Sequence, residues 1–342
     1  MNIPLIDQSA VAGRGIFYVG GRETEDERGR YICDQMYVEV LTPKEPRHPY
    51  PIILFHGAGQ TNVGWMLTPD GRVGWADYFV SQGYVVYLAE QPARGRSPWH
   101  PAANGPTIHH PIEALERFTT NVGRWPQAAL HTQWPEGKEA LEQFLKSQVE
   151  YLPSNRAAQQ LMLDAGSALL KLTGPAILLT HSQAGPFGWL LADAQPELVK
   201  GIVALEPSGP PFSTDLSQAK AKNFGIADLP MHFEPPVSDP EEFPLELYPA
   251  PASGLNDGWI LRESRWKLPR LAGIPIVLLT SEASYHAGYD HLTSLVLNQF
   301  GVPHDFVRLE DVGIHGNGHM MMLEKNSLQI AAWIRTWLER HE

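Results

Sequence analysis

The sequence predicts an α/β protein in which helices flank a mostly parallel central sheet. Short continuous apolar runs recur along the chain, at 51–55, 83–89, 175–180, 201–205 and 274–280. Continuous rather than alternating apolar runs are typical of strands buried on both faces. The stretches 75–82 (WADYFVSQ) and 325–340 carry apolar residues at helical spacing. Strands that alternate with helices in this way indicate a parallel sheet covered on both sides.

Further strands are expected near the two ends of the chain. Residues 15–20 (GIFYVG) and 36–41 (MYVEVL) are rich in aromatic and β-branched residues, and polar, turn-like residues lie between them. This composition favours strands. Residues 305–309 (DFVRL) form one more apolar run, just before the C-terminal helical segment. The sheet is therefore expected to extend on both sides of the central runs.

Two long stretches interrupt the alternation of strands and helices. Residues 98–150 are rich in Pro, His and Trp, and residues 207–270 hold many of the 30 prolines. Irregular stretches of this length inside a compact domain are usually functional. We therefore expect a single domain over residues 1–342, in which the insertions 98–150 and 207–270 form a cap or lid.

Composition and charge exclude several classes of protein. The net charge of −12 makes nucleic acid an unfavourable partner. Cys33 is the one cysteine, which excludes an intrachain disulfide and a cysteine-based zinc site. No run approaches the about 18 apolar residues of a membrane span. The start, MNIPLIDQSAVAGRG, does not resemble a signal peptide, so the default expectation is a cytoplasmic protein, with export left open if a leader has been removed.

A candidate nucleophile lies in the segment THSQAG, residues 180–185. Ser182 follows a predicted buried strand and precedes a predicted helix. A sharp strand-to-helix turn of this kind presents the serine in α/β-hydrolases, where small residues on either side let the helix approach the strand. Ala184 is small, but Thr180 replaces the usual first glycine. The alternative is that Ser182 only caps the next helix.

A serine nucleophile needs a base, and the segment GIHGNGHMMM at 313–322 contains two histidines. Histidine is expected between the last strand and the last helix in this fold class. We favour His319, which directly precedes a helical run, over His315, which lies on a glycine-flanked loop. A metal-binding pair of the two is disfavoured, because Gly316 and Gly318 oppose a helix that would align them and no third ligand is evident.

The acid that orients the histidine has more than one candidate. The usual position follows the strand at 274–280, where Glu282 and later Asp290 occur. Glu206 ends the strand at 201–205, and this places its carboxylate at the crevice where parallel sheets bind ligands. A carboxylate beside such an apolar run needs a partner, and a histidine N–H would serve. From the residues alone, Glu206 and Glu282 are nearly equal candidates.

The turn HGAG at 56–59 is the expected oxyanion-binding turn. It follows the first central strand, where one backbone N–H of the oxyanion site is usually supplied, and the residue after the nucleophile supplies the other. We assign these donors to Ala58 and Gln183, with Gly59 as the alternative to Ala58. The absence of GxGxxG and of GKS or GKT disfavours nucleotide binding. The arginines of QPARGRS at 91–97 are interpreted as structural, contacting carbonyls or carboxylates.

Taken together, these segments resemble those of a known family. HGAG, GWADYFVSQGYVVYLAEQPARGRS, THSQAG, ALEP and GNGHMMMLEKNS are similar to the atypical bacterial esterases of the α/β-hydrolase superfamily, and the resemblance runs from about residue 15 to 340. It implies that Ser182 is the nucleophile, His319 the base and Glu206 the acid. It also implies a capped enzyme without metal or cofactor, in a family whose members can be homodimers.

The expected function is therefore that of a serine carboxylic-ester hydrolase. Trp-rich insertions favour small hydrophobic or aromatic esters, and the expected partner is a small-molecule substrate, with no nucleic acid, no membrane span and no cofactor. Two alternatives stay open. One is lactonase or other hydrolase chemistry in the same pocket, and the other is a non-catalytic ligand-binding protein on the same fold.

Overall fold

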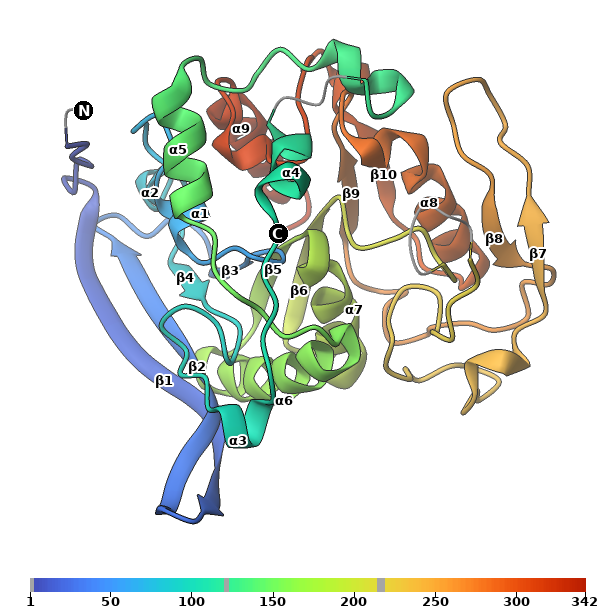
Figure 1. The fold of residues 1–342 in the computed structure, drawn as a ribbon, viewed down its shortest axis with the longest axis horizontal. Helices are drawn as coiled ribbons and strands as arrows, with labels where there is room; N and C mark the ends of the chain where they lie inside the picture. Colours follow the sequence, from blue (N-terminus) through green and yellow to red (C-terminus); the bar gives the residue numbers. More distant parts are fainter. Residues whose placement is uncertain (1–2, 120–122, 214–218) are drawn as a thin grey trace.

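The computed structural model of the chain describes residues 3–119, 123–213 and 219–342 and has one large sheet at its centre (Figure 1). Its strands are β1 (Val11–Asp26), β2 (Gly29–Pro43), β3 (Ile52–Phe55), β4 (Val86–Ala89), β5 (Ala176–His181), β6 (Val199–Leu205), β9 (Ile276–Thr280) and β10 (Asp305–Arg308). Their order is β1-β2-β4-β3-β5-β6-β9-β10. The strands β4, β3, β5, β6, β9 and β10 are parallel to one another. β2 pairs antiparallel with both β1 and β4. The predicted mostly parallel sheet is confirmed.

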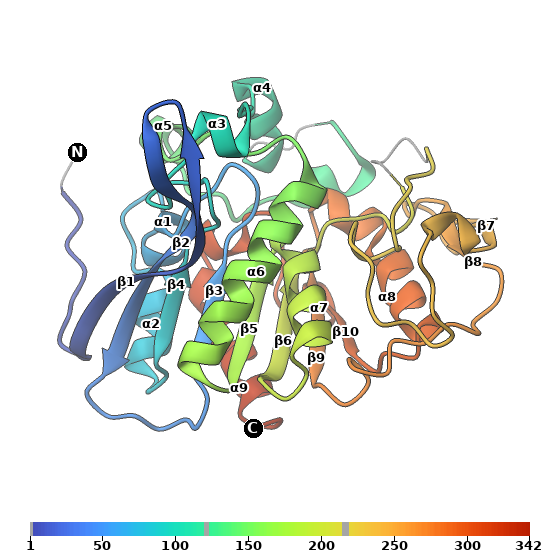
Figure 2. The same cartoon turned by 90° about the horizontal axis from the view of Figure 1, so that it is seen from below.

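The central strands are buried on both faces, which explains their continuous apolar runs. In β3, Ile53 and Phe55 belong to the core on one face of the sheet, whereas Ile52 and Leu54 belong to the core on the other. One face is covered by α6 (Asn155–Thr173), α7 (Gly185–Ala194) and α8 (Asp290–Gln299). The opposite face is covered by α1 (Val63–Met66), α2 (Trp75–Ser81) and α9 (Ser327–Leu338), as Figure 2 shows from below.

The longest helix, α6, begins and ends at residues that favour helix termini, and two predicted helices are observed. The Ser154 hydroxyl accepts a hydrogen bond from the Ala157 N–H and so caps the start of α6, and Gly174 follows its last residue. The predicted helices at 75–82 and 325–340 are observed as α2 and α9. Across the described ranges, no helix is both long and apolar enough to cross a bilayer.

The first insertion, 98–150, folds into short helical pieces. These are α3 (Pro101–Asn104), α4 (Ile112–Leu115), η1 (Glu116–Phe118), η2 (Pro126–Leu130) and α5 (Lys138–Lys146). The insertion bonds to loops that follow three different strands. Val149 N–H donates to Gly59 O, the Trp125 indole donates to Ala283 O, and Thr132 N–H donates to Gly316 O. It therefore lies across the carboxyl ends of the central strands.

The second insertion, 207–270, packs beside α8 at the far side of the sheet (Figure 1). It contains η4 (Pro240–Glu242) and a short hairpin of β7 (Leu245–Tyr248) and β8 (Gly258–Leu261). The sequence analysis did not predict this hairpin, because prolines surround its strands and Leu247 faces solvent. The insertion also buries a cluster of aromatic rings against Phe300, which follows α8; the cluster is formed by Phe212, Phe224, Phe233, Phe243 and Trp266.

Candidate active site

Ser182 occupies a strained turn directly after β5. It begins η3 (Ser182–Ala184), which leads into α7, and its φ of 55° lies in the left-handed region that non-glycine residues rarely adopt. Such strain persists where surrounding structure enforces it, most often at functional sites. The residues that cap η3 and α7 are His181 and Ala184, so Ser182 does not serve as a helix cap.

Thr180 fits in place of the usual glycine because the helix compensates for its side chain. Gly188 in α7 faces Thr180, and a Cβ atom at Gly188 would lie 3.2 Å from the Thr180 methyl group. Because Gly188 has no side chain, α7 leaves room for the side chain of Thr180 on β5. This keeps α7 close to β5 and preserves the sharp turn at Ser182.

His319 and Glu206 form a buried pair across the ends of two strands. The Nδ1 atom of His319 lies 2.6 Å from Oε2 of Glu206, and both side chains are almost completely inaccessible to solvent. Glu206 also accepts hydrogen bonds from the Ser281 N–H at 2.8 Å and the Ser284 hydroxyl at 2.7 Å. Like Ser182, Glu206 has a positive φ, of 43°, at the end of its strand.

Tyr285 connects this pair to the serine. Its hydroxyl lies 3.4 Å from Nε2 of His319, and Tyr285 lines the same cavity as Ser182. Nε2 of His319, the nitrogen that does not face Glu206, is thus directed toward the residue that adjoins Ser182 in the cavity wall. The structure therefore brings together Ser182, His319 and Glu206. The sequence analysis did not single out Tyr285, because nothing in its local pattern distinguishes it from other loop tyrosines.

The rival candidates lie nearby but have different partners. Glu282 accepts a hydrogen bond from the Gly316 N–H at 2.7 Å, and its Oε1 lies 3.2 Å from Nδ1 of His315. The His315 side chain is 63% exposed. Glu282, the alternative acid, and His315, the alternative base, therefore pair with each other at the surface. His315 and His319 face different carboxylates and do not form a shared metal site.

Asp290, the third candidate acid, forms a separate buried pair. It lies 3.0 Å from Nδ1 of His286 and accepts a hydrogen bond from the Thr280 hydroxyl at 2.7 Å. The other ring nitrogen of His286 lies 2.8 Å from the Tyr289 hydroxyl. The His286 ring stacks on that of His319, with centroids 4.9 Å apart. The spacing of four residues between His286 and Asp290 was a signal that the sequence analysis did not use.

The electrostatics of the pair favour a neutral histidine. Burial lowers the pKa of His319 well below 6.5, and the neighbouring His181, His286 and Arg117 lower it further. Burial and the charge of Asp290 raise the pKa of Glu206, and the hydrogen bonds from Ser284 and Ser281 oppose that rise by favouring the carboxylate. A neutral imidazole beside a hydrogen-bonded carboxylate is the arrangement that a general base requires.

His181 links the end of β5 to the backbone of His319. Its Nε2 lies 2.9 Å from the carbonyl oxygen of His319, to which the neutral ring donates. Burial lowers the pKa of His181 to about 3, so it stays neutral at physiological pH. The residue that precedes the serine therefore holds the backbone of His319 in place.

The turn at 56–59 lies against Ser182. A Cβ atom at Gly57 would be 3.0 Å from Cβ of Ser182, closer than most Cβ contacts in proteins, so glycine favours this approach. Within the described parts of the chain, the N–H groups of Ala58 and Gln183 donate no hydrogen bond. Gly59 faces the first insertion instead, where its carbonyl accepts a hydrogen bond from Val149.

Arg94 joins the two turns that carry these N–H groups. Its guanidinium is buried and donates to the carbonyls of Gly57 and Gln60 and to the side chain of Gln183, at 3.3 to 3.4 Å. Burial lowers the pKa of Arg94 to about 9, which leaves it charged at neutral pH. Arg96 similarly holds Glu90 at 2.8 Å. The interpretation of this loop as structural, with arginines on carbonyls and carboxylates, is confirmed.

A cavity of about 620 Å³ opens in front of Ser182. Its wall combines aromatic rings with polar groups, and includes Trp125, Tyr285, Tyr289, Arg117, Asn155 and Gln159. Trp125 and Arg117 come from the first insertion, whereas Asn155 and Gln159 come from α6. The insertion therefore contributes directly to the space in which a ligand would contact the serine.

The ligand atoms of Glu206, His286 and His319 lie within 4.8 Å of one another, close enough to hold a metal ion. Their bonding argues against that use. Nδ1 of His319 faces Glu206, and the two nitrogens of His286 face Asp290 and Tyr289. A metal would have to displace these hydrogen bonds, so the donor set fits proton transfer better than coordination.

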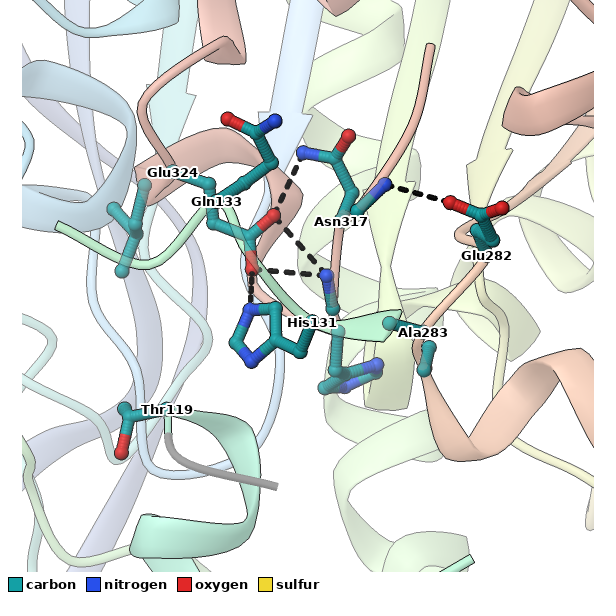
Figure 3. Close-up of polar contacts among 12 residues, drawn as sticks. Thr119, His131, Gln133, Glu282, Ala283, Asn317 and Glu324 are labelled. Atoms are coloured by element: carbon teal, nitrogen blue, oxygen red, sulfur yellow. Dashed lines mark hydrogen bonds and ion pairs between the residues drawn. The ribbon is translucent and has the colours of Figure 1, made fainter. Parts of the chain in front are cut away.

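A second buried carboxylate, Glu324, fixes the loop that carries His319 (Figure 3). One oxygen lies 2.6 Å from Nε2 of His131 and accepts from the Gly318 N–H at 2.9 Å; the other accepts from the Asn317 amide at 2.7 Å. His131 belongs to the first insertion. In addition, the N–H of Gln133 donates to the carbonyl of Gly316. The insertion therefore helps to position the residues immediately before His319.

Comparison with known proteins agrees with this geometry. A protein of a fungal species (Fungal sp.) named "Probable secreted lipase phiG" is 41% identical over 331 residues, which cover 95% of this chain and 89% of that protein. The solved structure of a bacterial esterase superposes with a TM-score of 0.70 at 24% identity, over 100% of this chain and 99% of the other, and shows the same fold. No protein-family model matches the chain.

The order of the sheet, the strained serine after β5 and this structural likeness define an α/β-hydrolase, as predicted. At 41% identity over nearly the whole length, the chain belongs to the same family as the fungal secreted lipase. It is therefore a hydrolase of the esterase and lipase class. The earlier resemblance to bacterial esterases is confirmed at the level of fold and class.

The contacts of Glu324 predict that Glu324→Gln impairs turnover without direct contact with substrate. An amide cannot accept from Gly318, Asn317 and His131 together, so the loop before His319 shifts. We expect kcat to fall by roughly 10- to 100-fold, because small displacements of a catalytic group cost that much, while KM changes less. Steady-state kinetics with a soluble aryl ester measures both.

The matched control for this change is Glu136→Gln. Glu136 is 92% exposed and lies on the same insertion, beside Lys325. It should retain parental kcat. A folded Glu324→Gln protein with parental kcat would contradict the positioning role.

Proposed function

We propose that the chain hydrolyses carboxylic esters through an acyl-enzyme, with Ser182 as nucleophile, His319 as general base and Glu206 as the acid that orients it. The observation that carries this proposal is the buried 2.6 Å contact between His319 and Glu206, next to a serine with a left-handed backbone. The second nitrogen of His319 lies 3.4 Å from the hydroxyl of Tyr285, which lines the same cavity as Ser182.

In the first half-reaction, Oγ of Ser182 attacks the ester carbonyl carbon while Nε2 of His319 accepts its proton. The Glu206 carboxylate stabilises the imidazolium and keeps the ring in the tautomer that leaves Nε2 free. The N–H groups of Ala58 and Gln183 stabilise the oxyanion that forms. The intermediate collapses when the carbon–alkoxy bond breaks, and His319 returns the proton to the departing alcohol.

In the second half-reaction, water replaces the alcohol. His319 accepts a proton from the water as its oxygen attacks the acyl carbon, and then returns that proton to Oγ of Ser182 as the acid product leaves. His319, oriented by Glu206, thus accepts one proton and returns it in each half-reaction. No step requires a metal or a cofactor.

Small hydrophobic or aromatic esters are the proposed substrates. The rings of Trp125, Tyr285 and Tyr289 line one side of the cavity and offer an apolar surface next to Ser182. Lactones are esters that the same steps would open, so lactonase activity is the nearest alternative. A non-catalytic binding protein is disfavoured, because it would have no use for a strained serine beside a buried His–Glu pair.

Four further proposals concern organisation, partners and location. The insertions 98–150 and 207–270 would act as a cap, and the first of them already contributes Arg117 and Trp125 to the cavity. The homodimer implied by the family resemblance stays a prediction, as does the expectation that nucleic acid is not a partner. Because the fungal relative is named a secreted lipase, export is proposed here in preference to the cytoplasmic default.

An activated serine should react with an organophosphonate ester probe. We expect covalent labelling at Ser182, located by peptide mass spectrometry, because the neutral His319 increases the nucleophilicity of Oγ. Ser182→Ala should lose labelling and ester turnover yet keep its thermal transition. A folded protein that is not labelled, or a Ser182→Ala variant with parental activity, would contradict the proposed nucleophile.

The two glutamates provide a matched comparison for the acid. Glu206→Gln should lower kcat by roughly 10³- to 10⁴-fold, because the amide no longer stabilises the imidazolium or the required tautomer. Glu282→Gln, which affects the exposed His315, should stay within a fewfold of the parent. Rates of both variants on one aryl ester decide between them, and the opposite ranking would move the acid to Glu282.

The pH dependence of kcat/KM should reflect the environment of His319. The base acts when neutral, so activity rises with pH through its pKa. Burial and the nearby His181, His286 and Arg117 lower that pKa, which places the acid limb of the profile below pH 6.5. A titration of kcat/KM from pH 4 to 8 measures the midpoint. A midpoint above pH 7 would contradict a pKa of His319 that burial and these neighbours lower.

A further inference from the structure

One cationic group in the cavity wall affects the proposed mechanism only through its charge, which lowers the pKa of His319. Arg117 belongs to η1 in the first insertion and lines the cavity together with Ser182. Its guanidinium stacks on the rings of Phe118, 4.6 Å from the centroid, and Tyr285, 5.4 Å from the centroid. Stacking holds the planar group by its faces and leaves the N–H edges available.

Arg117 also differs from the other arginines near the site in its lack of partners. Its Nε atom is buried without a hydrogen bond, and among the residues that the structure describes no carboxylate forms an ion pair with it. Arg94 and Arg96 are bonded to carbonyls and carboxylates, and Arg124 donates to the Glu113 carbonyl. A half-buried guanidinium without an anionic partner is costly, and a ligand anion would offset that cost.

Arg117 lies against two aromatic rings that both neighbour His319. Tyr285, on which it stacks, has its hydroxyl 3.4 Å from Nε2 of His319 and lines the same cavity as Ser182. Phe118, the other stacking ring, lies 5.1 Å from the His319 ring between centroids. An anion bound to Arg117 would therefore belong to the same small molecule whose ester carbonyl contacts Ser182.

The rest of the cavity restricts the charge of that molecule. Asp228 lines the same cavity, where its carboxylate accepts a hydrogen bond from Gln159, and the whole chain carries a net charge of −12. Both disfavour a multiply charged ligand such as a phosphate monoester. A single carboxylate suits one planar guanidinium, with which it can form two parallel hydrogen bonds.

We propose that Arg117 binds a free carboxylate of the substrate, so that the preferred substrates are esters of small aromatic or apolar molecules that carry one additional carboxylate near the ester carbonyl. This inference rests on the proposed esterase function and narrows its substrate class. The aromatic wall contacts the apolar part of the molecule, and Arg117 contacts its charged end.

The test compares each charged ester with its neutral, methyl-capped counterpart. One pair carries the carboxylate on the acyl side: 4-nitrophenyl hydrogen glutarate and 4-nitrophenyl methyl glutarate. The other carries it on the alcohol side: 4-acetoxybenzoate and methyl 4-acetoxybenzoate. A charge-assisted hydrogen bond predicts that kcat/KM for the charged member of at least one pair is higher by about 10- to 100-fold.

The variant Arg117→Met keeps an apolar stem for Phe118 and Tyr285 and removes the charge. The ratio of charged to neutral kcat/KM should fall to near one or below. Arg265→Met is the matched control, because Arg265 also stacks on a ring, that of Trp266 at 4.1 Å, but lies outside the cavity. It should keep the parental ratio. Arg117→Gln provides a second variant if the methionine variant does not fold.

The outcomes separate this inference from the proposed function. A preference for the charged ester that is lost in Arg117→Met and kept in Arg265→Met supports the carboxylate site. Equal rates for both members of both pairs, or a preference that survives Arg117→Met, would overturn the site while leaving the esterase intact. If the protein hydrolysed none of the four esters and Ser182 were not labelled by the phosphonate probe, the proposed function would fail and the substrate class with it.

Discussion

The short hydrogen bond between His319 and Glu206 is the interaction on which the rest of the site depends. A carboxylate at the end of a buried strand is poorly solvated, so it requires donors from the protein. Ser281 and Ser284, from the loop after β9, provide two of them, and His319, from the loop after β10, provides the third. The adjacent parallel strands β6, β9 and β10 bring these groups to the same edge of the sheet.

The loop that carries His319 is held from several sides, and one of these lies in an insertion. His181 bonds to the carbonyl of His319 from the end of β5, whereas the buried Glu324 joins Gly318 to His131 of the first insertion. A segment that lines the cavity therefore also positions His319. The same insertion presents Arg117 and Trp125 to the cavity, so changes in it would affect turnover and substrate choice together.

Much of the fold was predictable, because each central strand is apolar on both faces and alternates with helices. The strands near residues 52, 86, 176, 202 and 276 follow from that pattern, as does the placement of Ser182 at a strand end. The hairpin β7–β8 was not predictable, because its stability comes from packing on α8 rather than from its own proline-rich sequence. Thr180 stands where the serine turn of this fold usually has glycine, and the structure explains this through Gly188, eight residues later in the chain, which leaves room for the threonine side chain.

The sequence by itself determined the fold class, the position of Ser182 at a strand end and the loop that carries His319, because these depend on local pattern and chain order. It left Glu206 and Glu282 nearly equal, since both follow buried strands. Only the tertiary structure separated them: Glu206 faces His319, whereas Glu282 faces the exposed His315. It also paired His286 with Asp290, and Glu324 with His131 across 193 positions. Contacts between distant segments depend on how the strands and loops pack, and no local pattern specifies that packing.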